Sequence, residues 1–116
     1  MTHWIIINDG VSIFSWSIVR NKLETLIKDA AGVVAMAVDP YKSYLFIADD
    51  QTVRRFEFEV SRGDDYMTPT LTLDNQSAIL FRDEGIRSIV VDEDHSVLYV
   101  ASTAGISTIE YAPEVL

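Results

Sequence analysis

Two acidic turns contain the residues of this chain best suited to hold a metal ion. Asp49-Asp50 and Asp92-Glu93-Asp94 could supply the carboxylate oxygens that Ca²⁺ prefers. Neither stretch has the full spacing of a calcium loop, with a glycine in the middle and a glutamate at the far end. We therefore interpret both as solvated turns. We predict no metal site and no cofactor, with calcium as the alternative.

Asp39 and Asp92 recur at equivalent places, and we predict a structural role for both. An aspartate in a turn commonly accepts hydrogen bonds from the backbone N–H groups that follow it. The two histidines, His3 and His95, have no histidine or carboxylate at metal-ligand spacing. The sequence contains no serine elbow, phosphate-binding glycine loop or paired-carboxylate motif, so we predict no catalytic residue.

Two short motifs in one polar segment point to binding or modification. Arg62-Gly63-Asp64 spells an integrin-type tripeptide, and Asn75-Gln76-Ser77 is an acceptor sequence for N-glycosylation. An exposed loop would present the tripeptide to a receptor, whereas an ordinary polar turn can have the same composition. Glycosylation of Asn75 requires a secreted protein. Both motifs are therefore candidate sites with a purely structural alternative.

The composition excludes several kinds of partner and site. The chain has 116 residues, 18 of them acidic and 9 basic, for a formal net charge of -9. Nucleic-acid binding requires a basic surface, so we predict no nucleic-acid partner. No apolar run reaches the length of a membrane span, and no signal peptide is visible at the start. The absence of cysteine excludes disulfides and thiolate sites.

The elements that position these residues repeat along the chain. Residues 34–60 align without gaps with residues 87–113, at an offset of 53 (92 − 39). A third, partial copy at the start of the chain aligns at an offset of 42 (46 − 4). A long gapless self-match is the signature of a structural repeat. The sequence therefore predicts a unit of 42 residues, with 11 extra residues (53 − 42) inserted within 61–78.

Each repeat unit is predicted to contain four short strands. The first strand is apolar throughout, which suits a strand buried on both faces. Residues 21–31 could also form a short helix, but the matching place in the next unit favours a strand. The expected strands are 33–38 and 86–91, 44–48 and 97–101, 53–60 and 106–111, and a weaker fourth near 23–28 and 79–82.

Four antiparallel strands in a repeat of about 42 residues are the pattern of a β-propeller blade. We therefore predict an all-β fold made of roughly two and a half blades, whereas closed propellers have about four to eight. The expected organisation is a partial blade at 1–31, a blade at 32–84 with an insertion at 61–78, and a partial blade at 85–116. A β-sandwich is the alternative fold.

The repeat resembles the blades of two families of six-bladed propellers. Asp39-Pro40 followed by Tyr44 to Asp49 is similar to the class B (YWTD) repeats of low-density-lipoprotein receptors. Leu45 to Asp49 and Leu98 to Ser102 look more like the strands of NHL and gluconolactonase-like propellers. The tryptophan and threonine of a complete YWTD motif are missing, and no calcium ligand of the gluconolactonase-like enzymes can be placed on this chain.

The resemblance implies a fold and leaves two functions open. The first is a non-catalytic binding or scaffold segment of a receptor-like propeller, which would meet a protein ligand or the remaining blades of the same propeller. The second is a fragment of a calcium-dependent hydrolase of the gluconolactonase-like class. The receptor-like families favour an extracellular or cell-surface location. In either case, an isolated segment with unpaired sheet edges is expected to self-associate, without inserting into a membrane.

Overall fold

The computed structural model describes residues 4–18, 21–62 and 69–112, and within these ranges the protein consists of β-strands and turns. The strands form three antiparallel sheets. This confirms the prediction of an all-β protein. The segment from residue 21 onward, for which a short helix was the alternative, contains the strand Lys22–Ile27.

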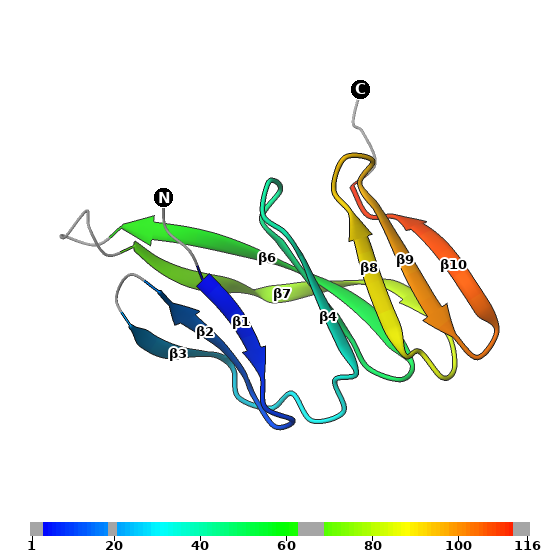
Figure 1. Cartoon of the computed structure of the whole chain (residues 1–116), viewed down its shortest axis with the longest axis horizontal. Coiled ribbons are helices and arrows are strands. Elements are labelled where there is room, and N and C mark those ends of the chain that lie inside the picture. Colours follow the sequence, from blue (N-terminus) through cyan, green and yellow to red (C-terminus); the bar gives the residue numbers. More distant parts are fainter. Residues whose placement is uncertain (1–3, 19–20, 63–68, 113–116) are drawn as a thin grey trace. The chain divides into compact units, whose positions relative to one another are not determined.

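The first sheet has the strand order β1–β2–β3, the second has β4–β5–β6–β7, and the third has β10–β9–β8 (Figure 1). The second sheet therefore has the four strands expected of each unit, and the first and third have three. The bounds are β1 (Trp4–Asn8), β2 (Ile13–Ser17), β3 (Lys22–Ile27), β4 (Ala35–Asp39), β5 (Tyr44–Ala48), β6 (Thr52–Arg62), β7 (Pro69–Arg82), β8 (Ser88–Asp92), β9 (Val97–Ser102) and β10 (Gly105–Glu110).

The strands group into two compact units. One unit comprises Met1–Gly32 and Phe58–Leu73, so the first sheet belongs with the distal parts of β6 and β7. The other comprises Val33–Glu57 and Asp74–Leu116, which contain the rest of the second sheet and the whole third sheet. Strands β5 and β9 lie in separate sheets, whereas one continuous sheet would have contradicted their assignment to different repeat units.

Strand pairing shows the repeat between the second and third sheets. Ala48 pairs with Val53 across the β5–β6 hairpin, and Ala101 pairs with Ile106 across the β9–β10 hairpin. Both pairs are separated by the same offset of 53 that the sequence alignment predicts (101 − 48 and 106 − 53). The offset therefore describes equivalent positions in three dimensions as well as in sequence.

The predicted offset of 42 for the first sheet is wrong, and the structure gives 40. Asn8 pairs with Ile13 across the β1–β2 hairpin, as Ala48 pairs with Val53, so equivalent residues differ by 40 (48 − 8 and 53 − 13). The hydrogen bonds of the two turns agree with this register. The extra length of the second unit is consequently 13 residues (53 − 40) rather than 11.

A left-handed serine closes the turn between the first two strands in both the second and the third sheet. Ser43 has a φ of 61° and Ser96 a φ of 54°, and the two residues are equivalent at the offset of 53. A positive φ is uncommon for a residue other than glycine. Its recurrence shows that the two turns share a backbone conformation as well as a length.

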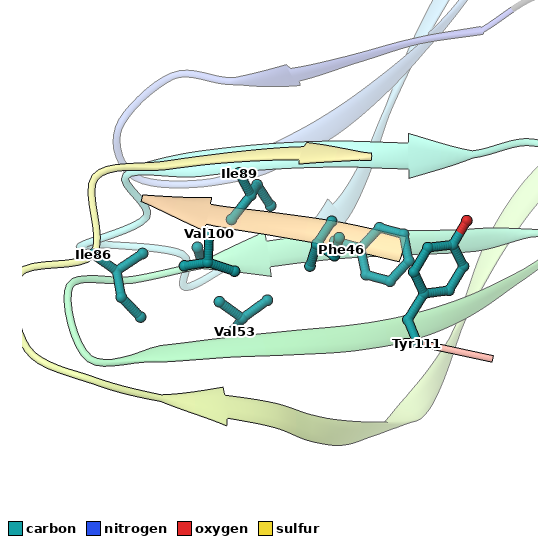
Figure 2. Packing of buried hydrophobic residues seen from close by; sticks show 8 residues of the cluster. Phe46, Val53, Ile86, Ile89, Val100 and Tyr111 are labelled. Carbon is teal, nitrogen blue, oxygen red and sulfur yellow. The ribbon is translucent and has the colours of Figure 1, made fainter. Parts of the chain in front are cut away.

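The compact unit made of Val33–Glu57 and Asp74–Leu116 has its hydrophobic core between the second and third sheets (Figure 2). Phe46, Ala48 and Val53 come from one face of the second sheet. Ile89, Leu98 and Val100 come from one face of the third sheet and complete the layer with Ile86 and Tyr111. The first strands of the two sheets, β4 and β8, are also in contact. Burying large apolar side chains of this kind stabilises by about 1.5–3 kcal/mol each.

The prediction that the first strand of each unit is buried on both faces is wrong. Residues 35–38 of β4 are only half-buried, and Val34 before them is exposed. In β8, Ile89 is buried while its neighbour Val90 is exposed. The alternation in β8 shows that one face of the third sheet packs against the second sheet and the other meets solvent.

The extra residues of the second unit lengthen two strands. β6 continues to Arg62 and β7 begins at Pro69, so residues 61–62 and 69–78 lie in strands. The insertion expected at 61–78 therefore consists of strand residues where the structure describes it. Pro69 is the first residue of its strand, where a missing N–H is tolerated.

Candidate functional site

A buried carboxylate joins the second and third sheets. Asp39 ends β4 and is completely buried. Its Oδ1 atom accepts hydrogen bonds from the backbone N–H groups of Tyr41, at 3.0 Å, and Lys42, at 3.1 Å. Its Oδ2 atom accepts a hydrogen bond of 2.5 Å from the hydroxyl of Tyr111. This carboxylate therefore holds its own turn and also fixes a residue from the third sheet.

Tyr111 fills the core on the third-sheet side of this contact. Its ring lies edge-on to Phe46, with ring centroids 4.6 Å apart (Figure 2). It also lies edge-on to the ring of Tyr44, with centroids 6.0 Å apart. Burial raises the pKa of Tyr111 well above its ordinary value, and the hydrogen bond to Asp39 raises the pKa further. The hydroxyl therefore stays protonated and acts as a hydrogen-bond donor at neutral pH.

Arg55 on β6 closes the same network from the second sheet. Its guanidinium group lies 4.6 Å from the centroid of the Tyr44 ring, within range of a cation–π interaction. Its Nη1 atom donates a hydrogen bond of 2.6 Å to the backbone carbonyl of Tyr111. The Nε atom is buried and has no hydrogen-bond partner among the described residues. The network therefore joins the second and third sheets.

The equivalent carboxylate in the third sheet has a different partner. The Oδ2 atom of Asp92 lies 2.9 Å from Nδ1 of His95, and its Oδ1 atom accepts a longer hydrogen bond of 3.4 Å from the His95 backbone N–H. The expectation that His95 has no carboxylate partner is therefore wrong. The pair is exposed to solvent. Among the described residues, no third histidine, aspartate or glutamate joins this pair to form a group that could hold a metal ion.

The turn at Asp49 uses its carboxylate to hold backbone and side-chain donors. Oδ1 accepts hydrogen bonds from the N–H groups of Gln51, at 2.8 Å, and Thr52, at 2.6 Å, while Oδ2 accepts one from the Thr52 hydroxyl at 3.0 Å. Partial burial alone would raise the pKa of Asp49, but these hydrogen bonds lower it overall. Both carboxylate oxygens of Asp49, one of the residues considered for calcium, are therefore engaged in hydrogen bonds within the turn.

The β1–β2 hairpin has the same turn, which the sequence analysis missed. The Oδ1 atom of Asp9 accepts hydrogen bonds from the N–H groups of Val11, at 2.9 Å, and Ser12, at 2.8 Å. These hydrogen bonds lower the pKa of Asp9. An aspartate followed three residues later by serine or threonine is the shared signal at Asp9 and Asp49. In the third sheet, Ser102 takes the place of the aspartate and accepts the N–H of Ala104 at 3.2 Å.

The integrin-type tripeptide and the glycosylation acceptor lie in the second sheet and in the segment that joins two of its strands in sequence. Arg62 is the last residue of β6, and Gly63 and Asp64 lie outside the described residues. Asn75 lies within β7, in the strand rather than in the turn of the long hairpin. His3, the other histidine considered for metal binding, also lies outside the described residues.

In the part of the chain that the structure describes, no group of three or more histidine, cysteine, aspartate or glutamate residues is placed to hold a metal ion. The same residues include no helix of the length and apolar character that a membrane span requires. Comparison of the chain with protein-family models, curated proteins and solved structures finds no match. The function must therefore be argued from the geometry alone.

Proposed function

We propose that this chain is a segment of a β-propeller and that it acts as a non-catalytic binding or scaffold module. The observation that carries the proposal is the packing of two equivalent sheets, the second and the third, one against the other. The face of the second sheet that contains Phe46 packs against the face of the third sheet that contains Leu98. These two faces are not equivalent in the repeat, so the contact is head-to-tail. Successive sheets of a propeller pack in this manner.

The recurrence of one hairpin plan in all three sheets supports the assignment of blades. Asp9, Asp49 and Ser102 occupy the same turn position and accept backbone N–H groups there. Asp39 and Asp92 likewise end the first strands of the second and third sheets. A chain that repeats one unit with the same turn chemistry is typical of architectures in which each unit packs on its neighbours.

The use of the polar side chains supports a non-catalytic role. The carboxylates of Asp9, Asp39 and Asp49 hold backbone N–H groups. Arg55 and Tyr111 complete the contact between sheets. An active site needs a nucleophile, acid or base directed at a space for substrate, whereas these groups are engaged in hydrogen bonds that hold turns or join the two sheets. The proposed partners are a protein ligand or further blades, and the net charge of -9 favours a partner other than nucleic acid.

The alternative of a calcium-dependent hydrolase is tested by activity. The purified chain should show no calcium-dependent hydrolysis of simple lactones, and calcium should not change its melting temperature. Hydrolysis that requires calcium would overturn the non-catalytic role. A crystal structure of the chain tests the blade assignment separately, because sheets that do not stack in succession would contradict it whatever the activity.

The binding role is tested with a displayed peptide library panned against the immobilised chain. We expect enrichment of a shared motif that binds the folded chain and fails to bind the heat-unfolded chain. Enrichment that is equal on both forms, or none at all, would contradict a binding function for the folded segment.

A further inference from the structure

The internal contact between the second and third sheets defines two kinds of sheet face. We call the face with Phe46, Ala48 and Val53 the receiving face, because the next sheet covers it. We call the face with Leu98 and Val100 the docking face, because it packs onto the preceding sheet. Every sheet of this repeat has both faces, since alternate residues of a strand point to opposite sides.

The receiving face of the third sheet has the apolar character of its counterpart but is exposed. Tyr99 and Ile106 are equivalent to the buried Phe46 and Val53 at the offset of 53. Tyr99 is nevertheless 42% exposed and Ile106 77% exposed. Val90, which pairs with Tyr99 on the same face, is exposed as well. The third sheet thus has an uncovered copy of a surface that the second sheet buries.

The docking face of the first sheet is exposed in the complementary manner. Ile5 and Ile7 are equivalent to Leu98 and Val100. The offset of 40 from the first to the second sheet and the offset of 53 from the second to the third together give 93 (98 − 5 and 100 − 7). Leu98 and Val100 are fully buried, whereas Ile5 is 45% exposed and Ile7 38% exposed. The chain therefore exposes a receiving face on one sheet and a docking face on another.

Two further residues follow the same pattern. Ile18 is equivalent to Tyr111 (111 − 18 = 93) and is 49% exposed, whereas Tyr111 is buried. Leu23, which pairs with Trp16 beside Ile5, is exposed too. Contiguous apolar surface of this kind on a protein typically marks an interaction site.

We propose that the docking face of the first sheet binds the receiving face of the third sheet in a second copy of this chain. The contact would repeat, between copies, the packing that already exists between the second and third sheets. A contact between two different faces is heterologous, so one copy retains a free docking face and the other a free receiving face, each available for a further neighbour or for closure. The inference rests on the blade assignment made above and is independent of the non-catalytic role.

The charge of the chain predicts how salt affects this association. Two copies with a net charge of -9 repel each other at long range. The proposed contact itself is apolar, so screening should weaken the repulsion and leave the attraction. Association should therefore strengthen as the salt concentration rises, whereas an association built on ion pairs would weaken.

Cysteine cross-linking tests the contact directly, because the natural chain has no cysteine. The rings of Phe46 and Tyr111 lie 4.6 Å apart in the internal contact, and their counterparts are Tyr99 and Ile18. A copy with Tyr99→Cys and a size-tagged copy with Ile18→Cys should therefore be joined by a short bis-maleimide when mixed. The control pairs a copy with Tyr41→Cys with the same tagged Ile18→Cys copy. Tyr41 is a turn residue that is 83% exposed and lies on neither face.

The expected result is a mixed cross-linked dimer for Tyr99→Cys with Ile18→Cys and none above background for the Tyr41→Cys control. Equal cross-linking of both pairs would overturn the proposal, because it would reflect random collision. A single chain with both Tyr99→Cys and Ile18→Cys that links only within itself would also overturn it, since the two faces would then meet in one copy.

Charge substitutions give a second, independent measurement. Ile106→Glu on the receiving face and Ile5→Glu on the docking face should each weaken self-association by roughly tenfold or more, because an unpaired charge is costly in an apolar contact. Tyr41→Glu should leave it unchanged. Sedimentation of each variant measures the association, and circular dichroism checks that each is folded. A monomeric natural chain at high salt would overturn the inference, while stacked sheets in an experimental structure would leave the blade assignment intact.

Discussion

The hydroxyl of Tyr111 donates a hydrogen bond to the carboxylate of Asp39, a residue 72 positions earlier in the chain. The carboxylate is at the end of the first strand of the second sheet, and the tyrosine directly follows the last strand of the third. Both residues are fully buried. One polar contact thus closes the apolar layer between the two sheets at one end, and it specifies how the third sheet is placed on the second.

Asp39→Ala should destabilise the chain by about 2–3 kcal/mol, because the Tyr111 hydroxyl and two turn N–H groups lose a charged acceptor. The matched control is Asp92→Ala at the equivalent position, where the carboxylate is partly exposed and bonds to His95. We expect the control to cost less than about 1 kcal/mol. Chemical denaturation measures both. Equal losses would show that the buried contact adds nothing beyond the turn.

A double-mutant cycle isolates the contact between the sheets. Tyr111→Phe removes the hydroxyl and keeps the ring against Phe46. Combined with Asp39→Ala, it should show a coupling energy of about 1–2 kcal/mol, in the range found for residues in direct contact. Tyr111→Phe with Asp92→Ala provides the uncoupled control. Additive losses for Tyr111→Phe with Asp39→Ala would contradict the role given to this hydrogen bond.

Gly85→Ala should be more damaging than the same change at its repeat equivalent, Gly32. Both glycines have positive φ, 68° at Gly85 and 88° at Gly32, so alanine costs about 1–2 kcal/mol at either site. Only at Gly85 would the new Cβ atom collide with the side chain of Thr103, while the space at Gly32 is open. Thermal unfolding of the two variants measures the difference.

The size of that difference can be checked by relieving the collision. Thr103→Ala in the Gly85→Ala background should recover part of the lost stability, even though it removes the hydrogen bond from the Thr103 hydroxyl to the carbonyl of Glu84. Equal destabilisation at Gly85 and Gly32, or no recovery, would contradict the close approach.

The Asx turns predict a loss of stability in acid. The pKa values of Asp9 and Asp49 are lowered in the folded chain, so their carboxylates stabilise the fold at and above the ordinary value of 3.8. This contribution is lost as the pH falls below 3.8 and through the folded pKa values. Asp49→Asn should reduce the acid dependence. Asp50→Asn serves as the control, because the hydrogen bond of Asp50 uses its backbone carbonyl, and the substitution keeps that carbonyl. Melting temperatures across the acid range measure the effect.

The sequence pattern was sufficient for the all-β class and for the relation between the second and third sheets, but it predicted β6 and β7 shorter than they are. The offset of 53 was readable because those sheets share their hairpin lengths and their turn residues, including Ser43 and Ser96. The offset of 42 for the first sheet places Trp4 on Phe46, so it matches aromatic residues and leaves the turn residues out of register. Aligning Asp9 with Asp49, the residues that hold the turns, gives the register that the structure has.

The contacts between sheets could not be read from the pattern. Nothing in the sequence distinguishes Asp39, which is buried under Tyr111, from Asp92, which pairs with His95 in solvent. The difference arises because another sheet covers one turn and leaves the other open. Residue type and spacing specify a turn, whereas the partner of its carboxylate depends on tertiary packing.

Alkaline pH should destabilise the chain through Tyr111. Burial and the hydrogen bond to Asp39 raise the pKa of Tyr111 in the folded chain well above its ordinary value of 10.0. The neutral phenol is therefore the form that the fold stabilises. Its contribution is complete below pH 10.0 and is lost as the pH rises from that value toward the folded pKa, because only the unfolded chain can ionise there. Unfolding monitored by circular dichroism should shift to lower denaturant concentration over this range.

Tyr111→Phe should remove most of this alkaline dependence, since phenylalanine cannot ionise, at the cost of a lower stability at neutral pH. Tyr41→Phe is the matched control, because Tyr41 is 83% exposed and lies outside the contact between the two sheets. The ultraviolet absorbance of tyrosinate gives a second reading: one tyrosine of the natural chain should ionise only as the chain unfolds, and that transition should be absent from Tyr111→Phe. A natural chain in which every tyrosine ionises before unfolding would contradict the buried contact, because the Tyr111 hydroxyl would then be open to solvent rather than held by Asp39.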